Sequence, residues 1–168
     1  MLVDREENNM SLIETTGDIW TYVPTHRIVI PTNTLGVMGA GLALAAKQKY
    51  PGIQDAYKWA LTFMPDKRVP WWDKRFPDLI LAPTKRHWVD KSRPQDVADI
   101  LLKLSKMQGG PYAIPEMGCG LGGLAWEFTK GFYKVFETAQ TEWVLVHPQT
   151  TKPSSTQSVK IWKKGILR

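Results

Sequence analysis

Cysteine is almost absent from this sequence: Cys119 is the only one in 168 residues. One cysteine cannot form an internal disulfide, so nothing in the chain calls for an oxidising compartment. The chain also lacks the run of roughly 18 apolar residues that a membrane-spanning helix needs. Residues 1–9 are charged rather than signal-like. We therefore expect a soluble, cytoplasmic protein with no membrane partner.

Several familiar site patterns are missing as well. No set of His, Cys, Asp and Glu has the spacing of a metal site, so we expect no metal and no cofactor. No glycine loop ends in Gly-Lys-Ser or Gly-Lys-Thr, which excludes a P-loop, and the Gly-x-Gly at 39–41 lacks the third glycine of the dinucleotide fingerprint. Internal repeats and low-complexity segments are absent too. A length of 168 residues with 43% hydrophobic content fits one globular domain, which we expect to be a monomer.

Positive charge is in excess. Lys and Arg number 22 against 16 Asp and Glu, for a net charge of +6. This balance favours an acidic partner, either a nucleotide or a nucleic acid, although a basic solvated surface would look the same.

Stretches with the apolar and β-branched pattern of strands alternate with stretches of helical spacing. The predicted strands are residues 11–16, 27–31, 78–82, 111–115 and 143–147. The predicted helices are residues 42–50, 55–64, 94–104 and 125–138. This alternation predicts an α/β fold, a three-layer α/β/α domain with a mixed, mostly parallel sheet.

Smaller signals refine this outline. Ser92 and Gln95 form a capping-box pattern around Pro94, at the start of the third helix. Residues 65–77, rich in proline and containing Trp71 and Trp72, predict an irregular segment. Residues 150–158 are a polar linker, so we expect a domain over 1–158 and a basic tail over 159–168. The tail could pack as a final strand or lie along nucleic acid.

Two glycine-rich stretches follow predicted strands. Glycines at 36, 39 and 41 separate one strand from an Ala/Leu-rich helix, and residues 118–124 carry a second set. Glycine allows close backbone approach, and free N–H groups at a helix start attract anions, so each stretch is either a phosphate cradle or an ordinary tight turn. Two cradles at one sheet edge would suit a pyrophosphate joining two sugars. Asp18, at a strand end, could accept hydrogen bonds from an adenine amine or cap a turn.

Lys85 directly follows a buried strand and precedes Arg86. A neighbouring cation lowers a lysine's pKa, and a neutral amine can attack the anomeric carbon of a sugar to give an imine. A solvated lysine or a phosphate clamp is the alternative. His87 could act as a general acid or base or be held within its loop. Cys119 could be a nucleophile or a small packing residue.

Three motifs together resemble a macrodomain, and they lie in the order typical of that family. The likeness covers roughly residues 11–148 and is closest to the branch of the DarG antitoxins and terminal ADP-ribose glycohydrolases. The motifs are Asn-Thr-Leu-Gly-Val-Met-Gly-Ala-Gly-Leu-Ala-Leu at 33–44, Pro-Thr-Lys-Arg-His-Trp at 83–88, and Gly-Cys-Gly-Leu-Gly-Gly-Leu at 118–124.

The resemblance implies a site for ADP-ribose with Lys85 as the catalytic residue. Its early strand end would bind adenine, its first glycine motif the distal ribose and a phosphate, and its second the pyrophosphate and distal ribose. The implied binding residues are Asp18, Ile19, Asn33, Thr34, Gly36, Val37, Met38, Gly39, Gly41, Gly118, Cys119, Gly120, Leu121 and Gly122.

The resemblance also implies an activity. DarG-like domains remove ADP-ribose from thymidine in DNA, reversing the modification made by an ADP-ribosyltransferase toxin, so modified DNA and such a toxin are the expected partners. The chain departs from the family at Ile30 and Pro31, where an asparagine is usual, and at Gly122 and Ala125, where acids occur. These departures leave Lys85 to act largely alone. A phosphatase acting on ADP-ribose 1″-phosphate and a non-catalytic ADP-ribose binding module are the alternatives.

Overall fold

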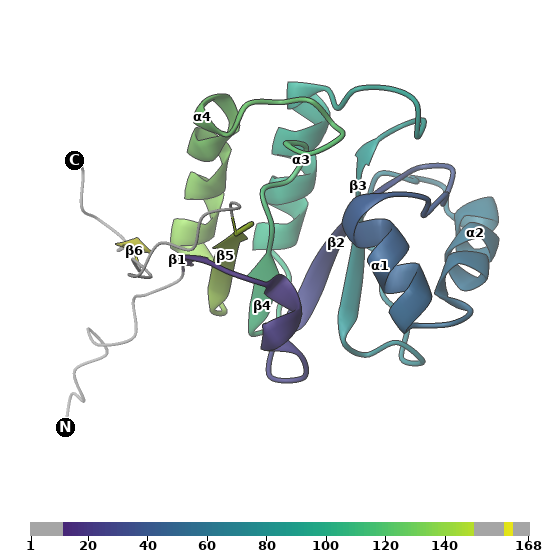
Figure 1. Ribbon diagram of the computed structural model, residues 1–168, viewed down its shortest axis with the longest axis horizontal. Helices are drawn as coiled ribbons and strands as arrows, with labels where there is room; N and C mark the ends of the chain where they lie inside the picture. Colours follow the sequence, from purple (N-terminus) through teal and green to yellow (C-terminus); the bar gives the residue numbers. More distant parts are fainter. Residues whose placement is uncertain (1–11, 150–159, 163–168) are drawn as a thin grey trace.

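The computed structural model describes residues 12–149 and 160–162, and these contain one twisted sheet (Figure 1). The strand order is β3-β2-β4-β5-β1-β6. Strands β1 to β5 pair in parallel, and β6 pairs antiparallel with β1. The bounds are β1 Leu12–Thr16, β2 Arg27–Asn33, β3 Leu79–Lys85, β4 Tyr112–Ile114, β5 Trp143–His147 and β6 Lys160–Trp162.

Helices cover both faces of the sheet, which confirms the predicted α/β/α layers (Figure 1). Helices α1, α2 and the short η2 pack on one face, and α3 and η3 pack on the other. No helix in the described part of the chain combines the length and hydropathy needed to cross a membrane. The bounds are η2 Ile19–Tyr22, α1 Gly41–Lys49, α2 Ile53–Phe63, α3 Pro94–Ser105, α4 Trp126–Thr129 and η3 Lys130–Thr138.

The alternation of side chains along β2 shows how the sheet feeds two cores. Ile28 and Ile30 point to the layer of α1 and α2, whereas Val29 points to the layer of α3. Because successive residues of a strand face opposite sides, an apolar run such as this one is buried on both. Helix α3 buries an apolar stripe of four residues at helical spacing: Val97, Ile100, Leu101 and Leu104.

The single helix predicted over residues 125–138 is wrong. Helix α4 ends at Thr129, and Lys130–Thr138 winds as a 3₁₀ helix. Three residues per turn align Tyr133 with Phe136, and both are fully buried. Three further apolar residues of this segment, Trp126, Phe132 and Val135, are only partly buried and pack around them.

The capping box predicted at the start of α3 is also wrong. Arg93 rather than Ser92 occupies the N-cap position, and no side chain caps the first turn. The N–H of Ser92 donates to the carbonyl of Gly122 at 2.9 Å, so a contact with a distant loop sets its position. Gln95 donates to Asp99 instead of reaching back to the cap.

Two strands run further than predicted, and part of the predicted tail joins the sheet. Strand β2 extends to Asn33 and β3 to Lys85, so five residues expected in loops are strand residues: Thr32, Asn33, Pro83, Thr84 and Lys85. Lys160–Trp162 forms β6, the final strand that was one of the two expectations for the tail. The remainder of residues 150–168 and Ser11 lie outside the described residues.

Candidate functional site

Two glycine loops leave the same edge of the sheet. The first glycine loop, residues 34–40, joins β2 to α1, and the second glycine loop, residues 115–125, joins β4 to α4. Strands β2 and β4 are parallel neighbours, so their carboxyl ends, and the loops that follow them, lie side by side (Figure 1). This edge is where open α/β sheets bind ligands. The structure therefore brings together the two stretches that the sequence singled out.

The first glycine loop is shaped by the buried amide of Asn33. Its oxygen accepts from the N–H groups of Leu35 at 3.1 Å and Val37 at 3.2 Å, and its nitrogen donates to the carbonyl of Val37 at 2.8 Å. The side chain expected to contact ribose is thus already engaged in building the loop. Thr34 also holds the loop in place, because its hydroxyl donates to the carbonyl of Arg86 at 2.7 Å.

Close packing explains two further residues of this loop. Gly36 has φ 74°, and a Cβ there would lie 2.8 Å from Cγ of Lys58, so only glycine fits without a shift. The Met38 side chain is fully buried, and its N–H donates to Gln54 at 2.8 Å. Both positions therefore fix the loop against α2, which carries Gln54 and Lys58. Val37, beside them, is half-buried.

The start of α1 is the open part of this loop. Gly39, Ala40 and Gly41 are exposed, and no side chain caps the helix. The first N–H groups of an α-helix have no partner within the helix, and the helix dipole favours negative charge there. An anion such as phosphate fits this position.

The second glycine loop is anchored by a buried tyrosine. The Tyr133 hydroxyl donates to the carbonyl of Pro115 at 2.7 Å and accepts from the N–H of Met117 at 2.6 Å. Complete burial raises the pKa of Tyr133 well above its ordinary value, so the hydroxyl keeps its proton. Beyond this anchor, Gly120 and Leu121 reach the surface.

Two glycines of the second loop are required by close contacts. A Cβ at Gly118, where φ is 79°, would lie 2.8 Å from Cγ2 of Val97. A Cβ at Gly122 would clash with the carbonyl of Gly118 and the hydroxyl of Ser92. Position 122, where the family that the sequence resembles can carry an acid, therefore has no room for a side chain here.

Lys85 ends β3 directly beside the first glycine loop. Thr32 pairs with Pro83 but Asn33 pairs with Lys85, so Thr84 is an extra residue that forms a β-bulge. Bulges re-aim the side chains that follow them. The carbonyl of Lys85 accepts from the N–H of Thr34 at 3.1 Å, which ties the strand end to the loop.

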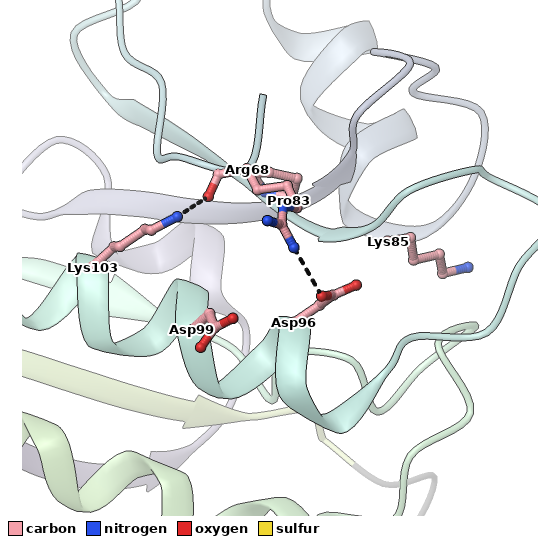
Figure 2. A pocket seen from close by; sticks show the side chains of 6 residues that line it. All are labelled: Arg68, Pro83, Lys85, Asp96, Asp99 and Lys103. Atoms are coloured by element: carbon pink, nitrogen blue, oxygen red, sulfur yellow. Dashed lines mark hydrogen bonds and ion pairs between the residues drawn. The ribbon is translucent and has the colours of Figure 1, made fainter. Parts of the chain in front are cut away.

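The Lys85 side chain lines a small surface pocket. The amine makes no hydrogen bond or ion pair within the described residues. Figure 2 shows it at one end of the pocket, extending away from the two aspartates. The lining residues are Arg68, Pro83, Lys85, Asp96, Asp99 and Lys103.

Asp96 is the most buried of the pocket residues that the sequence analysis did not single out. It is 8% exposed and forms ion pairs with Arg68 and Arg86, each at 3.5 Å. Arg86, the cation expected to lower the pKa of Lys85, therefore forms an ion pair with the Asp96 carboxylate. Asp96 lies in the first turn of α3, where acidic residues are common for helix-dipole reasons, so its sequence carried no specific signal.

Three other candidates have structural roles. The ring Nδ1 of His87 accepts from the N–H of Val89 at 3.2 Å, as expected if the residue is held within its loop. Burial raises the pKa of the Cys119 thiol, which lies 3.3 Å from the Thr129 hydroxyl, so its environment disfavours the thiolate of a nucleophile. The Asp18 carboxylate accepts from the N–H of Trp20 at 3.0 Å and caps η2.

Asp18 is nevertheless exposed, and its neighbour Ile19 is buried in the core. Strand β1 that precedes them is parallel to β5, so Asp18 lies at the same carboxyl edge as the glycine loops. One carboxylate oxygen forms the cap, and a carboxylate has acceptor capacity for further bonds.

His147 bridges two glutamates, a contact that the sequence alone did not indicate. The two ring nitrogens of His147 each lie 2.5 Å from a carboxylate oxygen, one of Glu14 and one of Glu116. Glu116 belongs to the second glycine loop, so the bridge ties that loop to β1 and β5. His147 is 133 residues from Glu14 and 31 residues from Glu116, so no local sequence pattern marks the three residues as partners. In the described chain, no group of His, Cys, Asp and Glu could hold a metal ion.

Comparison with known proteins places this geometry in a family. No family model matches the chain. A DNA ADP-ribosyl glycohydrolase of Thermus aquaticus is 29% identical over 158 residues, which cover 86% of this chain and 43% of the relative. A DNA ADP-ribosyl transferase-DNA ADP-ribosyl glycohydrolase fusion protein of Thermosipho africanus is 32% identical over 143 residues, 70% of this chain and 36% of the relative.

A solved structure extends the match to the fold. The macrodomain of Thermus aquaticus DarG superposes with a TM-score of 0.67 at 28% identity, covering 81% of this chain and 97% of that one. The chain spans less than half the length of the curated relatives just named. The sheet, the paired glycine loops and these similarities together identify the chain as a macrodomain related to the DarG DNA ADP-ribosyl glycohydrolases.

Proposed function

We propose that this macrodomain is an ADP-ribosyl hydrolase that removes ADP-ribose from thymidine in DNA. The observation that carries the proposal is the meeting of three features at one sheet edge: the two glycine loops and the end of β3, which carries Lys85. The relatives described as DNA ADP-ribosyl glycohydrolases support the choice of DNA as the modified molecule.

The glycine loops would hold the diphosphate and the distal ribose. The uncapped start of α1 offers N–H groups to one phosphate. In the second loop, Gly120 and Leu121 are exposed and carry N–H groups with no hydrogen bond in the described part of the chain. Asp18 would accept from the adenine amine with the oxygen that its cap leaves available.

Lys85 would perform the chemistry as a nucleophile. Its amine attacks the anomeric carbon, the bond from that carbon to the base breaks with its electron pair, and the base takes up the proton that the attacking amine loses. Opening of the sugar gives an imine on the lysine. Water then hydrolyses the imine, which releases ADP-ribose and restores the amine.

The test compares Lys85→Ala with Lys47→Ala, which removes an exposed amine on α1. Release of ADP-ribose from a thymidine-modified oligonucleotide should fall by about 10²-fold or more in Lys85→Ala, as for loss of a central catalytic group. Calorimetric binding of ADP-ribose should persist in both variants. Full activity of Lys85→Ala would contradict the role of this lysine.

A non-catalytic ADP-ribose binding module is the second candidate, and one observation favours it. Gly122 has no room for the acid that could assist a lysine, and Ala125 supplies none either. Tight calorimetric binding without turnover on modified DNA would support this function. Release of inorganic phosphate from ADP-ribose 1″-phosphate would instead reveal the phosphatase.

The same proposal includes a partner. The Thermosipho africanus relative joins a DNA ADP-ribosyl transferase to the glycohydrolase in one chain. We therefore propose an ADP-ribosyltransferase that makes the modification as the functional partner of this macrodomain. Co-expression should test it, because an active macrodomain would lower the level of modified DNA that such a transferase produces.

A further inference from the structure

The loop between β3 and α3 connects the two glycine loops. This bridging loop, residues 86–93, is fixed at its start by the hydroxyl of Thr34, which donates to the carbonyl of Arg86 at 2.7 Å. It is fixed near its end by the N–H of Ser92, which donates to the carbonyl of Gly122 at 2.9 Å. The bridging loop therefore spans the rim of the proposed ADP-ribose site from one glycine loop to the other.

The bridging loop is strongly basic. Lys85 immediately before it and three cations within it, Arg86, Lys91 and Arg93, outnumber the one carboxylate of the stretch, Asp90, although Arg86 pairs with Asp96 of α3. The aliphatic part of Lys91 lies over the second glycine loop, since a Cβ at Gly123 would be 3.4 Å from its Cδ. These positive charges would attract a polyanion whose modified unit sits in the site.

An exposed indole lies between the cations. Trp88 is 54% exposed, and its ring centroid is 5.5 Å from that of His87. A hydrogen-bonded turn orients this pair: the N–H of Val89 donates to Nδ1 of His87, and the N–H of Asp90 donates to its carbonyl. The indole is thus presented on an ordered turn rather than packed into a core.

We propose that the bridging loop binds the single-stranded DNA that flanks the modified thymidine, with Trp88 stacking on a neighbouring base and Lys91 contacting a phosphate. The proposal rests on the function proposed above and names the surface that reads its substrate. A base-paired duplex buries the faces that an indole would stack on, whereas a single strand offers them. An acidic peptide would satisfy the cations but leave the exposed indole without a partner.

The experiment compares two substrates, ADP-ribosylated thymidine as a mononucleoside and the same unit within a single-stranded oligonucleotide. For the wild-type protein, kcat/KM should be higher on the oligonucleotide. Trp88→Ala should reduce the ratio of the two values about tenfold, as for one lost base stack. The control is Trp59→Ala, which removes an indole that is 68% exposed on α2 and should leave the ratio unchanged. An equal ratio in all three proteins would overturn the proposal.

Binding measurements separate this proposal from the proposed function. If the wild-type protein releases ADP-ribose from neither substrate, the hydrolase function fails, yet fluorescence anisotropy with an unmodified oligothymidylate still tests the surface. Trp88→Ala should weaken that binding and Trp59→Ala should not. Lys91→Gln should lower the slope of log affinity against log salt by about one unit at most, as for one lost phosphate contact. Unaltered oligothymidylate binding by Trp88→Ala, or binding of the wild-type protein to acidic peptides alone, would overturn the proposal that the bridging loop binds single-stranded DNA.

Discussion

In the first glycine loop, the side chain that shapes the loop is Asn33, the last residue of the strand that delivers it. In the second glycine loop, the supporting groups come from distant parts of the chain. Tyr133 holds the loop from η3, Ser92 meets it from the bridging loop, and His147 of β5 holds Glu116. The first cradle is therefore shaped mainly by local hydrogen bonds of one side chain, and the second by groups from three distant segments.

This difference affects how each loop responds to substitution. In the first loop a single amide makes three of the hydrogen bonds, so one change removes these three together and leaves only the bonds of Thr34 and Met38 to other segments. A loop held by several separate groups loses only part of its support with each change. Variants in the two loops can test this contrast directly.

The largest effect should come from Asn33→Ala. This change removes one acceptor of two hydrogen bonds and one donor to the carbonyl of Val37, all at a buried site. Unfolding free energy measured in urea should fall by about 3 kcal/mol, as expected when buried backbone groups lose their partners. ADP-ribose affinity, measured by calorimetry, should fall with it.

Asn33→Asp is the matched control for that variant. A carboxylate keeps the acceptor for Leu35 and Val37 but cannot donate to the Val37 carbonyl. Its loss of stability should be smaller than that of alanine. If Asn33→Ala were as stable as the wild-type protein, the local construction of this loop would be refuted.

The sequence predicted the layers of the fold well because apolar periodicity records burial. The apolar run of β2, Ile28, Val29 and Ile30, is buried, and so is the apolar stripe of α3. The position of both glycine loops at one edge also followed, since parallel strands β2 and β4 must end together. These features depend on local pattern and on the geometry of parallel sheets.

Features set by tertiary contacts could not be predicted in this way. The bond from Ser92 to Gly122 displaced the expected helix cap, and the fully buried Tyr133 and Phe136 align in a 3₁₀ turn rather than an α-helix. The ion pairs of Asp96 and the bridge at His147 join residues far apart in the chain. Nothing in the spacing of these residues identifies their partners.

The next largest effect on stability should come from replacing a glycine by alanine, which adds one methyl group to each loop. Gly122→Ala places a methyl group against the Gly118 carbonyl and the Ser92 hydroxyl, which should cost about 2 kcal/mol of stability through overpacking. Gly39→Ala is the control, because its Cβ would meet nothing closer than Val37 Cγ1 at 3.8 Å. Thermal unfolding measures both variants. Equal stability of the two would show that the second loop yields more readily than its contacts imply.

The smallest effect should have the opposite sign and comes from Ser92→Ala. The Ser92 residue is 5% exposed, and its hydroxyl has no hydrogen-bond partner in the described part of the chain. Removing an unsatisfied buried hydroxyl should stabilise the protein by about 1 kcal/mol, whereas the N–H that bonds Gly122 remains. Thr34→Ala is the contrast, because it deletes a hydroxyl that donates to the Arg86 carbonyl and should destabilise by a similar amount. Urea unfolding of the two variants should move in opposite directions, and a loss of stability in Ser92→Ala would show that its hydroxyl supports the second loop after all.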